Sequence, residues 1–434
     1  MWIAILFMAL AATIASIFYL IGRFKKFYFV RRLARGSKKR LKLFGFLCLL
    51  PLIIYGVFDL VNAIIIMLHL SVFWLIFEAF ASLHRKLKKR RRARLKIDLP
   101  YEVGADTEAE VDSAVSTEAV VSGESEDGDT AADAVSRDDD KKQNESEDDG
   151  KKYWLGAAVL IFTTVYLAIG WYNAHHVAIT KYKVNTEKNI GKDTIRIVQI
   201  TDSHVGTTFD GEGFAEHMKT VQDLHPDIVV ITGDYVDDST TKEDMVRSCE
   251  ALGELETTYG IYYVYGNHDR GYYSSRDFSA DDMEEELKKN NVVILKDESV
   301  LVDGLFYVVG REDASADNER RSDVSGRLSA QELTEGLDKS KFILMLDHQP
   351  TDYDNEAASG ADLVLSGHSH GGQLIPLQFI GQYIIRANNR TYGIEKRKGT
   401  TFIVCSGISD WEIDYKTGCI SEIVVVDVTK KLSD

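Results

Sequence analysis

The chain has 434 residues, 45% of them hydrophobic, and a formal net charge of −16, so it is long enough for more than one domain. The charge is unevenly distributed, because the segment Glu102–Asp149 holds 18 acidic and 3 basic side chains and supplies almost the whole net charge. No basic face typical of nucleic-acid-binding domains is present, so we expect no nucleic-acid partner.

Three apolar stretches could cross a bilayer, whose core of about 30 Å requires about 20 helical residues. They are Trp2–Ile21, a block from about Leu43 to Leu83, and Trp154–Tyr172. The second stretch is too long for one span and is interrupted near Asp59 and Asn62. We therefore predict a helical hairpin there, and four transmembrane helices in all.

Two basic segments, Arg23–Lys42 and Arg85–Lys96, flank these apolar stretches. Short basic loops next to spans stay in the cytoplasm. We predict that both segments lie there, with Met1, the turn near Asp59 and everything after about Asn173 on the other side. The protein would then be a multi-pass cell-membrane protein in contact with the lipid bilayer, and its C-terminal domain would be extracytoplasmic.

The apolar stretches allow two other interpretations. The first could be a cleaved signal peptide, but it lacks a basic segment before its apolar core. The spans could also belong to a transporter or channel, which would need charged side chains inside the membrane. Asp59 and Glu78 are isolated charges in the sequence, so we favour an anchor.

Composition predicts the domain organisation. We expect a membrane region with three transmembrane helices at 1–98, a disordered acidic linker at 99–152, a fourth helix at 153–173 and a globular domain at 174–434. The linker has almost no aromatic side chains, so it cannot bury enough apolar surface to offset its ordering entropy.

Four cysteines, Cys48, Cys249, Cys405 and Cys419, show no CxxC spacing, so they indicate no disulfide framework. One bridge between Cys405 and Cys419 stays open. The simpler interpretation is that these cysteines are small buried hydrophobes.

The C-terminal domain alternates short apolar runs with helix-like stretches, which predicts an α/β fold. Several runs are continuously apolar, as expected for strands that are buried on both faces. The predicted strands are Ile195–Ile200, Ile228–Ile231, Ile261–Tyr265, Leu305–Val309, Phe342–Leu346, Leu363–Leu365, Phe402–Val404 and Ile423–Val426. The predicted helices are Gly213–Leu224, Lys242–Thr257 and Asp281–Asn290.

Five of these runs are followed directly by Asp, Asn or His. The sets are Asp202-Ser203-His204, Gly233-Asp234, Gly266-Asn267-His268-Asp269, His348 and Gly367-His368-Ser369-His370. Ligands of α/β proteins collect beyond the carboxyl ends of strands, and imidazoles with carboxylates suit Zn, Fe or Mn. Each set alone could be a turn or a satisfied polar residue, but five such sets in succession predict one metal centre.

These motifs resemble the calcineurin-like metallophosphoesterase superfamily over about Thr194 to Val426. The run from Gly367 to Gln373, with Tyr392-Gly393-Ile394, is similar to its bacterial membrane-anchored branch, which includes enzymes similar to UDP-2,3-diacylglucosamine pyrophosphatase. The resemblance implies a two-sheet sandwich flanked by helices and a site for two divalent metal ions. By resemblance, one ion would be held by Asp202, His204 and His370, the other by Asn267, His348 and His368, and Asp234 would bridge them.

The resemblance also implies the reaction, in which a hydroxide activated by the metal ions attacks phosphorus. The catalytic residues would be His268, which stabilises or protonates the leaving oxygen, and Asp269, which orients His268. Arg270 could contact phosphate or form an ion pair, and the loop Glu312–Arg327 would set specificity.

We therefore predict a membrane-anchored, metal-dependent phosphoric ester hydrolase that acts on a phosphoester or pyrophosphate. The anchor makes a lipid-linked or cell-envelope substrate the first candidate. The alternative is a membrane scaffold or sensor with a vestigial metal site, which loss of a ligand would have indicated.

Overall fold

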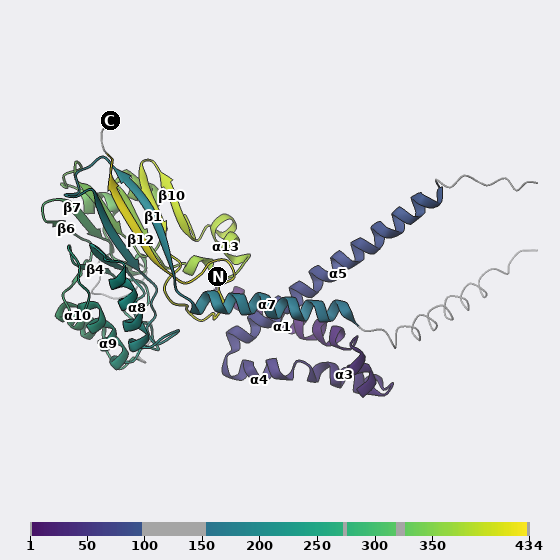
Figure 1. Cartoon of the computed structure of the whole chain (residues 1–434). Helices are drawn as coiled ribbons and strands as arrows, with labels where there is room; N and C mark the ends of the chain where they lie inside the picture. Colours follow the sequence, from purple (N-terminus) through teal and green to yellow (C-terminus); the bar gives the residue numbers. More distant parts are fainter. Residues whose placement is uncertain (1, 98–152, 272–275, 318–325, 432–434) are drawn as a thin grey trace, which may run out of the picture. The chain divides into compact units, whose positions relative to one another are not determined.

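The computed structural model describes residues 2–97, 153–271, 276–317 and 326–431 (Figure 1). The predicted acidic linker, 99–152, lies entirely outside these ranges. The chain forms two compact units, Met1–Thr164 and Val165–Asp434, which we call the helical unit and the sheet unit. The boundary falls inside one helix, α7 (Trp154–His175).

The helical unit is built from apolar helices. They are α1 (Trp2–Phe24), α2 (Tyr28–Ala34), α3 (Lys38–Leu47), α4 (Leu50–Phe58), α5 (Leu60–Ile97) and the first part of α7. Among the described residues, three segments are long and apolar enough to cross a membrane: Lys38–Phe58, Leu60–Arg91 and Trp154–His175. A shorter apolar helix, Leu10–Phe24, lies in the first predicted span.

The predicted hairpin is present, but its first arm begins earlier than expected. The apolar segment starts at Lys38 and has 21 residues, so the first arm is not too short to span a bilayer. Its helix is interrupted between α3 and α4, where Pro51 occupies the first turn of α4 and its missing N–H removes no helical hydrogen bond. Asp59 breaks the helix before α5 and accepts a hydrogen bond from the Asn62 backbone N–H at 3.0 Å.

The expectation that Glu78 is an isolated charge is wrong. Its carboxylate lies 2.6 Å from the Arg23 guanidinium and 3.2 Å from Lys26 Nζ, and it accepts a hydrogen bond from the Tyr153 hydroxyl at 3.2 Å. The end of α1, the middle of α5 and the start of α7 therefore meet around one carboxylate. Because these charges are paired with one another, they give no sign of a transport pathway.

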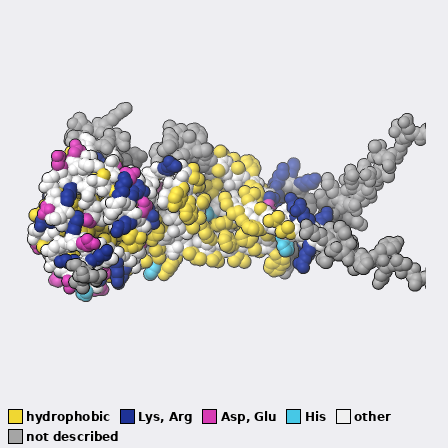
Figure 2. All heavy atoms as spheres, turned by 90° about the horizontal axis from the view of Figure 1, so that it is seen from above, with side chains coloured by type: hydrophobic (Ala, Val, Ile, Leu, Met, Phe, Trp, Pro, Cys, Tyr) yellow, Lys and Arg dark blue, Asp and Glu magenta, His cyan; other side chains and the backbone are white. Residues whose placement is uncertain are grey.

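Hydrophobic side chains cover the length of the helical unit, and Lys and Arg side chains gather at one of its ends (Figure 2). Large exposed apolar side chains include Leu10, Ile14, Phe18, Leu60, Leu75, Phe80 and Ile161. Contiguous apolar surface of this kind indicates a membrane environment. The unit therefore has the surface of a membrane-embedded bundle.

The sheet unit contains two six-stranded mixed sheets (Figure 1). In spatial order the first is β1 (Ala178–Thr186), β12 (Glu422–Lys430), β2 (Thr194–Ile200), β3 (Ile228–Thr232), β4 (Ile261–Val264) and β5 (Val292–Ile294). The second is β10 (Gly393–Arg397), β11 (Thr400–Val404), β9 (Leu363–Ser366), β8 (Phe342–Leu346), β7 (Phe306–Gly310) and β6 (Glu298–Val302). In each sheet the central neighbours β2–β3–β4 and β7–β8–β9 run parallel.

Three apolar layers define a four-layer sandwich. The inner layer joins the sheets through residues such as Val230 and Leu344. One outer face is covered by α8 (Gly211–Asp223), α9 (Lys242–Gly253) and α10 (Ala280–Lys289). The other is covered by α11 (Ala330–Thr334) and α12 (Tyr353–Ala358). The predicted fold class, a two-sheet sandwich flanked by helices, is confirmed.

All eight predicted strands are present, and four further strands were missed. The missed strands are β1, β5, β6 and β10. β1 and β10 lie at sheet edges, and their residues alternate between more and less exposed positions. Such strands contain no continuous apolar run, which was the pattern on which the prediction rested. α9 ends at Gly253 rather than Thr257. All four cysteines are free, so the Cys405–Cys419 bridge is absent.

Gly310 tests the packing between the sheets. A methyl group added there would lie 2.3 Å from Leu295 Cβ and 2.7 Å from Val264 Cγ1. We expect Gly310→Ala to lower the free energy of unfolding by about 1–3 kcal/mol through overpacking, measured by urea unfolding in detergent. Gly381→Ala is the control, since nothing lies within 4 Å of its added carbon, and it should change stability by less than about 1 kcal/mol. Equal effects would contradict the packing of β7.

Candidate metal centre

The carboxyl ends of strands from both sheets meet at one place. The residues after β2, β3 and β4 come from the first sheet, and those after β8 and β9 come from the second. Their side chains form three groups of potential metal ligands: Asp202–His204–His370, Asp234–His348–His368 and His204–Asp237–His268, which shares His204 with the first. We call the first two the first and second clusters, because they contain the ligands that the resemblance implied. The structure therefore brings together the residues that the motifs predicted.

All three side chains of the first cluster are buried. Asp202 and His204 have no exposed surface and His370 is 6% exposed. The Nε2 atoms of His204 and His370 lie 3.2 Å apart, and His370 Nε2 lies 3.4 Å from an Asp202 carboxylate oxygen. Three donor atoms thus converge on one point.

In the second cluster, the donor atoms also lie close together, and His368 is only partly buried. His348 Nε2 lies 3.1 Å from Asp234 Oδ2, while its Nδ1 lies 2.7 Å from the Thr232 backbone oxygen. The His368 ring lies 2.8 Å from the side-chain oxygen of Asn267. Asn267 therefore borders this cluster, as the motif Gly-Asn-His-Asp predicted.

Asp234 lies between the two clusters. Its Oδ2 atom is 3.1 Å from His348 Nε2 and 3.8 Å from His204 Nε2. Its Oδ1 atom accepts a hydrogen bond from the backbone N–H of His268 at 2.8 Å. One carboxylate oxygen thus faces a histidine of each cluster, which is the position a bridging ligand would require.

The histidine contacts fit a bound cation. His204 Nδ1 faces an Asp237 oxygen at 3.2 Å, and His370 Nδ1 faces the Ser409 backbone oxygen at 3.3 Å. The Nε2 atoms of the two rings thus face each other, and both are placed to coordinate one cation.

The pKa values of the ligand imidazoles are shifted in different directions, because burial and neighbouring carboxylates act against each other. Burial lowers the pKa of His368 to about 4 and holds the pKa of His370 well below its usual range, so both are neutral, as metal ligands must be. Burial also opposes charge on His348, but the attraction of Asp234 outweighs it and raises the pKa of His348. The second cluster can therefore bind either a proton or a metal ion.

The backbone at these positions is strained. Asp202, His204, Asp234, His368 and His370 all have positive φ, from 38° for His204 to 67° for His368. Residues other than glycine rarely adopt this conformation, and such strain concentrates at functional sites. The polar loops can hold it because they are anchored in two rigid sheets.

Two glycines allow the loops to approach this closely. A Cβ atom on Gly367 would lie 2.1 Å from Thr201 Oγ1, and one on Gly266 would lie 2.3 Å from the Asp234 backbone nitrogen. Both positions are fully occupied by neighbouring atoms, so only glycine fits. The glycines in the motifs Gly-Asn-His-Asp and Gly-His-Ser-His thus have a packing reason.

The Asp269 carboxylate contacts the loop backbone. Both of its oxygens accept hydrogen bonds from backbone N–H groups, at Asp234, Tyr235, Val236 and Gly266, over 2.6 to 3.1 Å. Asp269 therefore holds the shape of the loop that carries Asp234, and its expected role in orienting His268 stays a prediction.

Asp237 is the carboxylate that contacts His268. Its oxygens lie 3.3 Å from His268 Nδ1 and 3.2 Å from His204 Nδ1. Burial opposes charge on His268, but Asp237 and Asp234 outweigh it and raise the pKa of His268. The Trp411 ring lies 5.1 Å from the His268 ring and is 41% exposed. The sequence prediction named neither residue, although Asp237 lies three residues after Asp234 in the run Gly-Asp-Tyr-Val-Asp, a spacing that could have indicated it.

Other predicted groups are used in ion pairs. Arg270 lies 2.7 Å from Glu312, which favours the ion-pair alternative over contact with phosphate. Arg327 lies 3.1 Å from Asp347, the residue before His348. Residues 318–325 of the predicted specificity loop lie outside the described ranges.

A buried lysine fixes the loop beside His370. Lys416 has no exposed surface, and its ammonium group donates hydrogen bonds to the backbone oxygens of Ser406 and Ser409 at 2.9 Å. It also lies 3.1 Å from an Asp410 oxygen. Since Ser409 in turn faces the His370 ring, Lys416 positions a candidate ligand indirectly.

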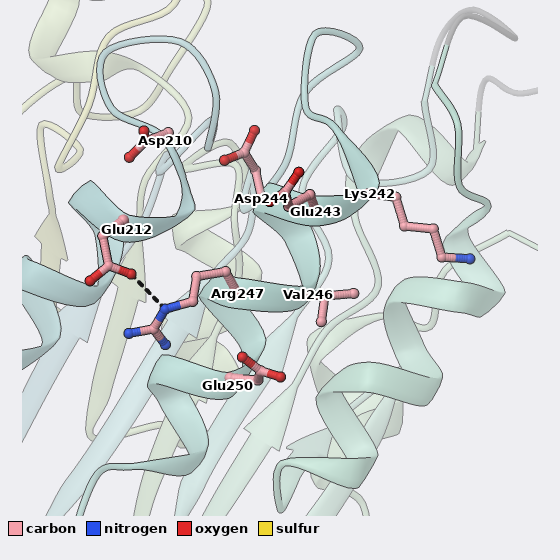
Figure 3. Close-up of a pocket in the computed structure, with 8 residues that line it drawn as sticks. All are labelled: Asp210, Glu212, Lys242, Glu243, Asp244, Val246, Arg247 and Glu250. Carbon is pink, nitrogen blue, oxygen red and sulfur yellow. Dashed lines mark hydrogen bonds and ion pairs between the residues drawn. The ribbon is translucent and has the colours of Figure 1, made fainter.

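A hollow on the surface of the sheet unit is a different feature. It has a volume of about 570 Å³ and lies between the N-terminal ends of α8 and α9 (Figure 3). Three of its five acidic side chains have partners: Asp210 and Asp244 accept hydrogen bonds from backbone N–H groups, and Glu212 pairs with Arg247 at 2.7 Å. None of its lining residues belongs to the metal-ligand clusters.

Comparison with known proteins agrees with this geometry. The family model of the calcineurin-like phosphoesterases matches residues 195–372. An uncharacterized metallophosphoesterase of Aquifex aeolicus is 30% identical over 260 residues, covering 59% of this chain and 94% of that protein. The chain therefore belongs to the calcineurin-like phosphoesterase family, whose members bind divalent metal ions.

Two other relatives are longer than the matched region. An uncharacterized metallophosphoesterase of Campylobacter jejuni is 31% identical over 245 residues, covering 56% of this chain and 61% of that protein. A transmembrane protein with metallophosphoesterase domain from Bos taurus is 28% identical over 282 residues, covering 62% of this chain and 61% of that protein.

The position of Asp269 yields a prediction. Asp269→Asn removes an acceptor from the loop of Asp234, so we expect Mn²⁺ affinity to fall about 10- to 100-fold, as for other supporting residues of metal sites. Isothermal titration of the metal-free protein measures this. The matched control is Asp281→Asn, an exposed carboxylate on α10, which should leave affinity unchanged. If Asp269→Asn bound Mn²⁺ normally, Asp269 would not support the loop of Asp234.

Proposed function

We propose that the protein is a membrane-anchored phosphoesterase that uses two divalent metal ions, Mn, Fe or Zn, to hydrolyse a phosphoester or pyrophosphate bond. The observation that carries this proposal is Asp234, whose one oxygen faces a histidine of each ligand cluster. In this proposal one ion is held by Asp202, His204 and His370, the other by Asn267, His348 and His368, and Asp234 is shared.

Two such ions supply a nucleophile by lowering the pKa of water, and they offset charge on the phosphate oxygens. The protein would hold the two ions among buried side chains, where their charge stabilises the transition state more strongly than it would in water. His268 would donate a proton to the leaving oxygen, or a hydrogen bond. Asp237 would position the ring through its contact with Nδ1.

The apolar helices support a substrate at the membrane. A site that is covalently joined to a span meets lipid-linked or cell-envelope phosphoesters at high local concentration. The similarity of Gly367–Gln373 to UDP-2,3-diacylglucosamine pyrophosphatase-type enzymes favours a pyrophosphate lipid as the first compound to test. A vestigial scaffold is disfavoured, because every predicted ligand is present and they lie together.

We also propose that the sheet unit is extracytoplasmic. The ion pairs of Glu78 place the ends of α1 and the start of α7 at one level of α5, next to the Lys- and Arg-rich end of the helical unit (Figure 2). Basic ends stay in the cytoplasm. α7 would then leave the cytoplasm and carry the sheet unit across.

Substitution of the shared ligand tests the mechanism. Asp234→Asn removes a charge that both ions share, so we expect loss of turnover of bis-p-nitrophenyl phosphate and loss of bound metal. His268→Ala is the matched variant: it should keep its metal and lose about 10²–10⁴-fold in rate. Metal content by mass spectrometry and turnover are measured on the same samples. Wild-type turnover by Asp234→Asn would rule out the dinuclear mechanism.

Cysteine labelling in intact cells tests the orientation. A cysteine at the exposed Lys181, on β1, should react with a membrane-impermeant maleimide, and one at Lys88, on α5, should not. The unsubstituted protein gives the background from the native cysteines, and labelling after lysis shows that both sites can react. Labelling of Lys88→Cys with protection of Lys181→Cys would place the sheet unit in the cytoplasm.

A further inference from the structure

An exposed apolar loop directly follows the metal-ligand motif. The loop, Ile375–Ile385, contains the short helix α13 (Leu377–Phe379) and the π-helical turn η4 (Ile380–Ile385). Its exposed large side chains are Ile375 (42%), Leu377 (51%), Phe379 (52%), Tyr383 (66%), Ile384 (74%) and Ile385 (58%). Such a concentration of exposed apolar side chains marks a binding surface, so we call this segment the apolar loop.

Hydrogen bonds within the sheet unit connect the apolar loop to the end of α7. The Lys416 backbone N–H donates to the Gly170 carbonyl oxygen in α7 at 2.9 Å. The next residue, Thr417, donates its N–H to Gln373 O at 2.8 Å and accepts from the Ile375 N–H at 3.0 Å through Oγ1. The stretch Lys416–Thr417 is therefore hydrogen-bonded both to α7 and to the start of the apolar loop.

Gly170 belongs to the apolar span Trp154–His175, not to the polar chain after it. A methyl group on Gly170 would lie 2.8 Å from Thr417 Cγ2, so the contact is close. The hydrogen bonds through Lys416 and Thr417 therefore connect Gln373 and Ile375, at the start of the apolar loop, to the end of α7. This continuity with the span distinguishes the loop from an apolar patch elsewhere on the domain.

The other end of the apolar loop leads to the candidate metal centre. His370 is five residues before Ile375 in the chain. The side-chain N–H of Gln373 donates to the Trp411 backbone oxygen at 3.3 Å, and the Trp411 ring faces His268 at 5.1 Å. The apolar loop is therefore connected through Gln373 and Trp411 to His268.

We propose that the apolar loop inserts into the bilayer surface and that Trp411 and the loop admit the lipid part of an amphiphilic phosphoester to the metal centre. This inference rests on the proposed function, since it takes α7 as a membrane span. Burial of apolar side chains in lipid removes them from water, and Tyr383 suits the headgroup level. Exposed Arg386, directly after the loop, would attract lipid phosphates.

Fluorescence of full-length protein in vesicles tests the insertion. Ile384→Cys, labelled with the environment-sensitive dye NBD, is reconstituted into vesicles of phosphatidylcholine and phosphatidylglycerol. Nitroxide-labelled phosphatidylcholine should quench the dye about twofold or more, because an interfacial element sits at the headgroup–acyl boundary. The control is Leu301→Cys on β6, which is 43% exposed and lies at the opposite edge of the second sheet from β10.

Quenching at Ile384→Cys with none at Leu301→Cys supports the inference, and equal quenching at both positions overturns it. Hydrolysis of the soluble diester bis-p-nitrophenyl phosphate, with Mn²⁺, is measured on the same vesicles and tests the proposed function separately. Turnover without quenching contradicts only the membrane-inserting loop. Quenching without turnover contradicts only the phosphoesterase, and thermal melting shows whether each variant is folded.

Discussion

The burial of carboxylates together with imidazoles is the constraint on which the rest of the structure depends. Asp202 and Asp234 lie in one pocket almost without exposed surface, and burial raises the pKa of Asp202. Such a cluster is costly without positive charge, and divalent ions would supply it. The positive φ angles, the close glycines and the backbone contacts of Asp269 all keep these groups at coordinating distance against their mutual repulsion.

Much of this arrangement could be predicted because parallel strands align their carboxyl ends. A motif after each buried run was enough to place Asp202, Asp234 and His348 together. The sequence could not show Trp411, whose contact with His268 arises when separate loops meet. Asp237 could have been indicated by its spacing from Asp234, but its contact with His268 depends on how two loops meet. The backbone contacts of Asp269 could not be predicted, because they depend on the shape of the loop that carries Asp234. Edge strands such as β1 were not predicted, because their buried and exposed residues alternate and form no continuous apolar run.

The membrane region shows the same limit. The length of each apolar stretch was enough to predict the helices, since a helix must have about 20 residues to cross a bilayer. The partners of Glu78 could not be predicted, because Arg23 lies far away in the chain and only helix packing brings the two together. The sequence places the basic segments next to the apolar helices, but it does not show that Glu78 of α5 pairs with Arg23 and Lys26 of the first segment.

The hydrogen bonds at the end of α7 also bear on how the domain could be released from its anchor. Gly170 and Asn173 bind the backbone of Lys416, and Ala174 accepts a hydrogen bond from the Ser421 hydroxyl. The last turns of the helix are therefore part of the fold that supports Lys416 and, through Ser409, His370. A protease that cut within these turns would shed a damaged protein, so the domain cannot be turned into a freely diffusing form simply by cleavage at its anchor.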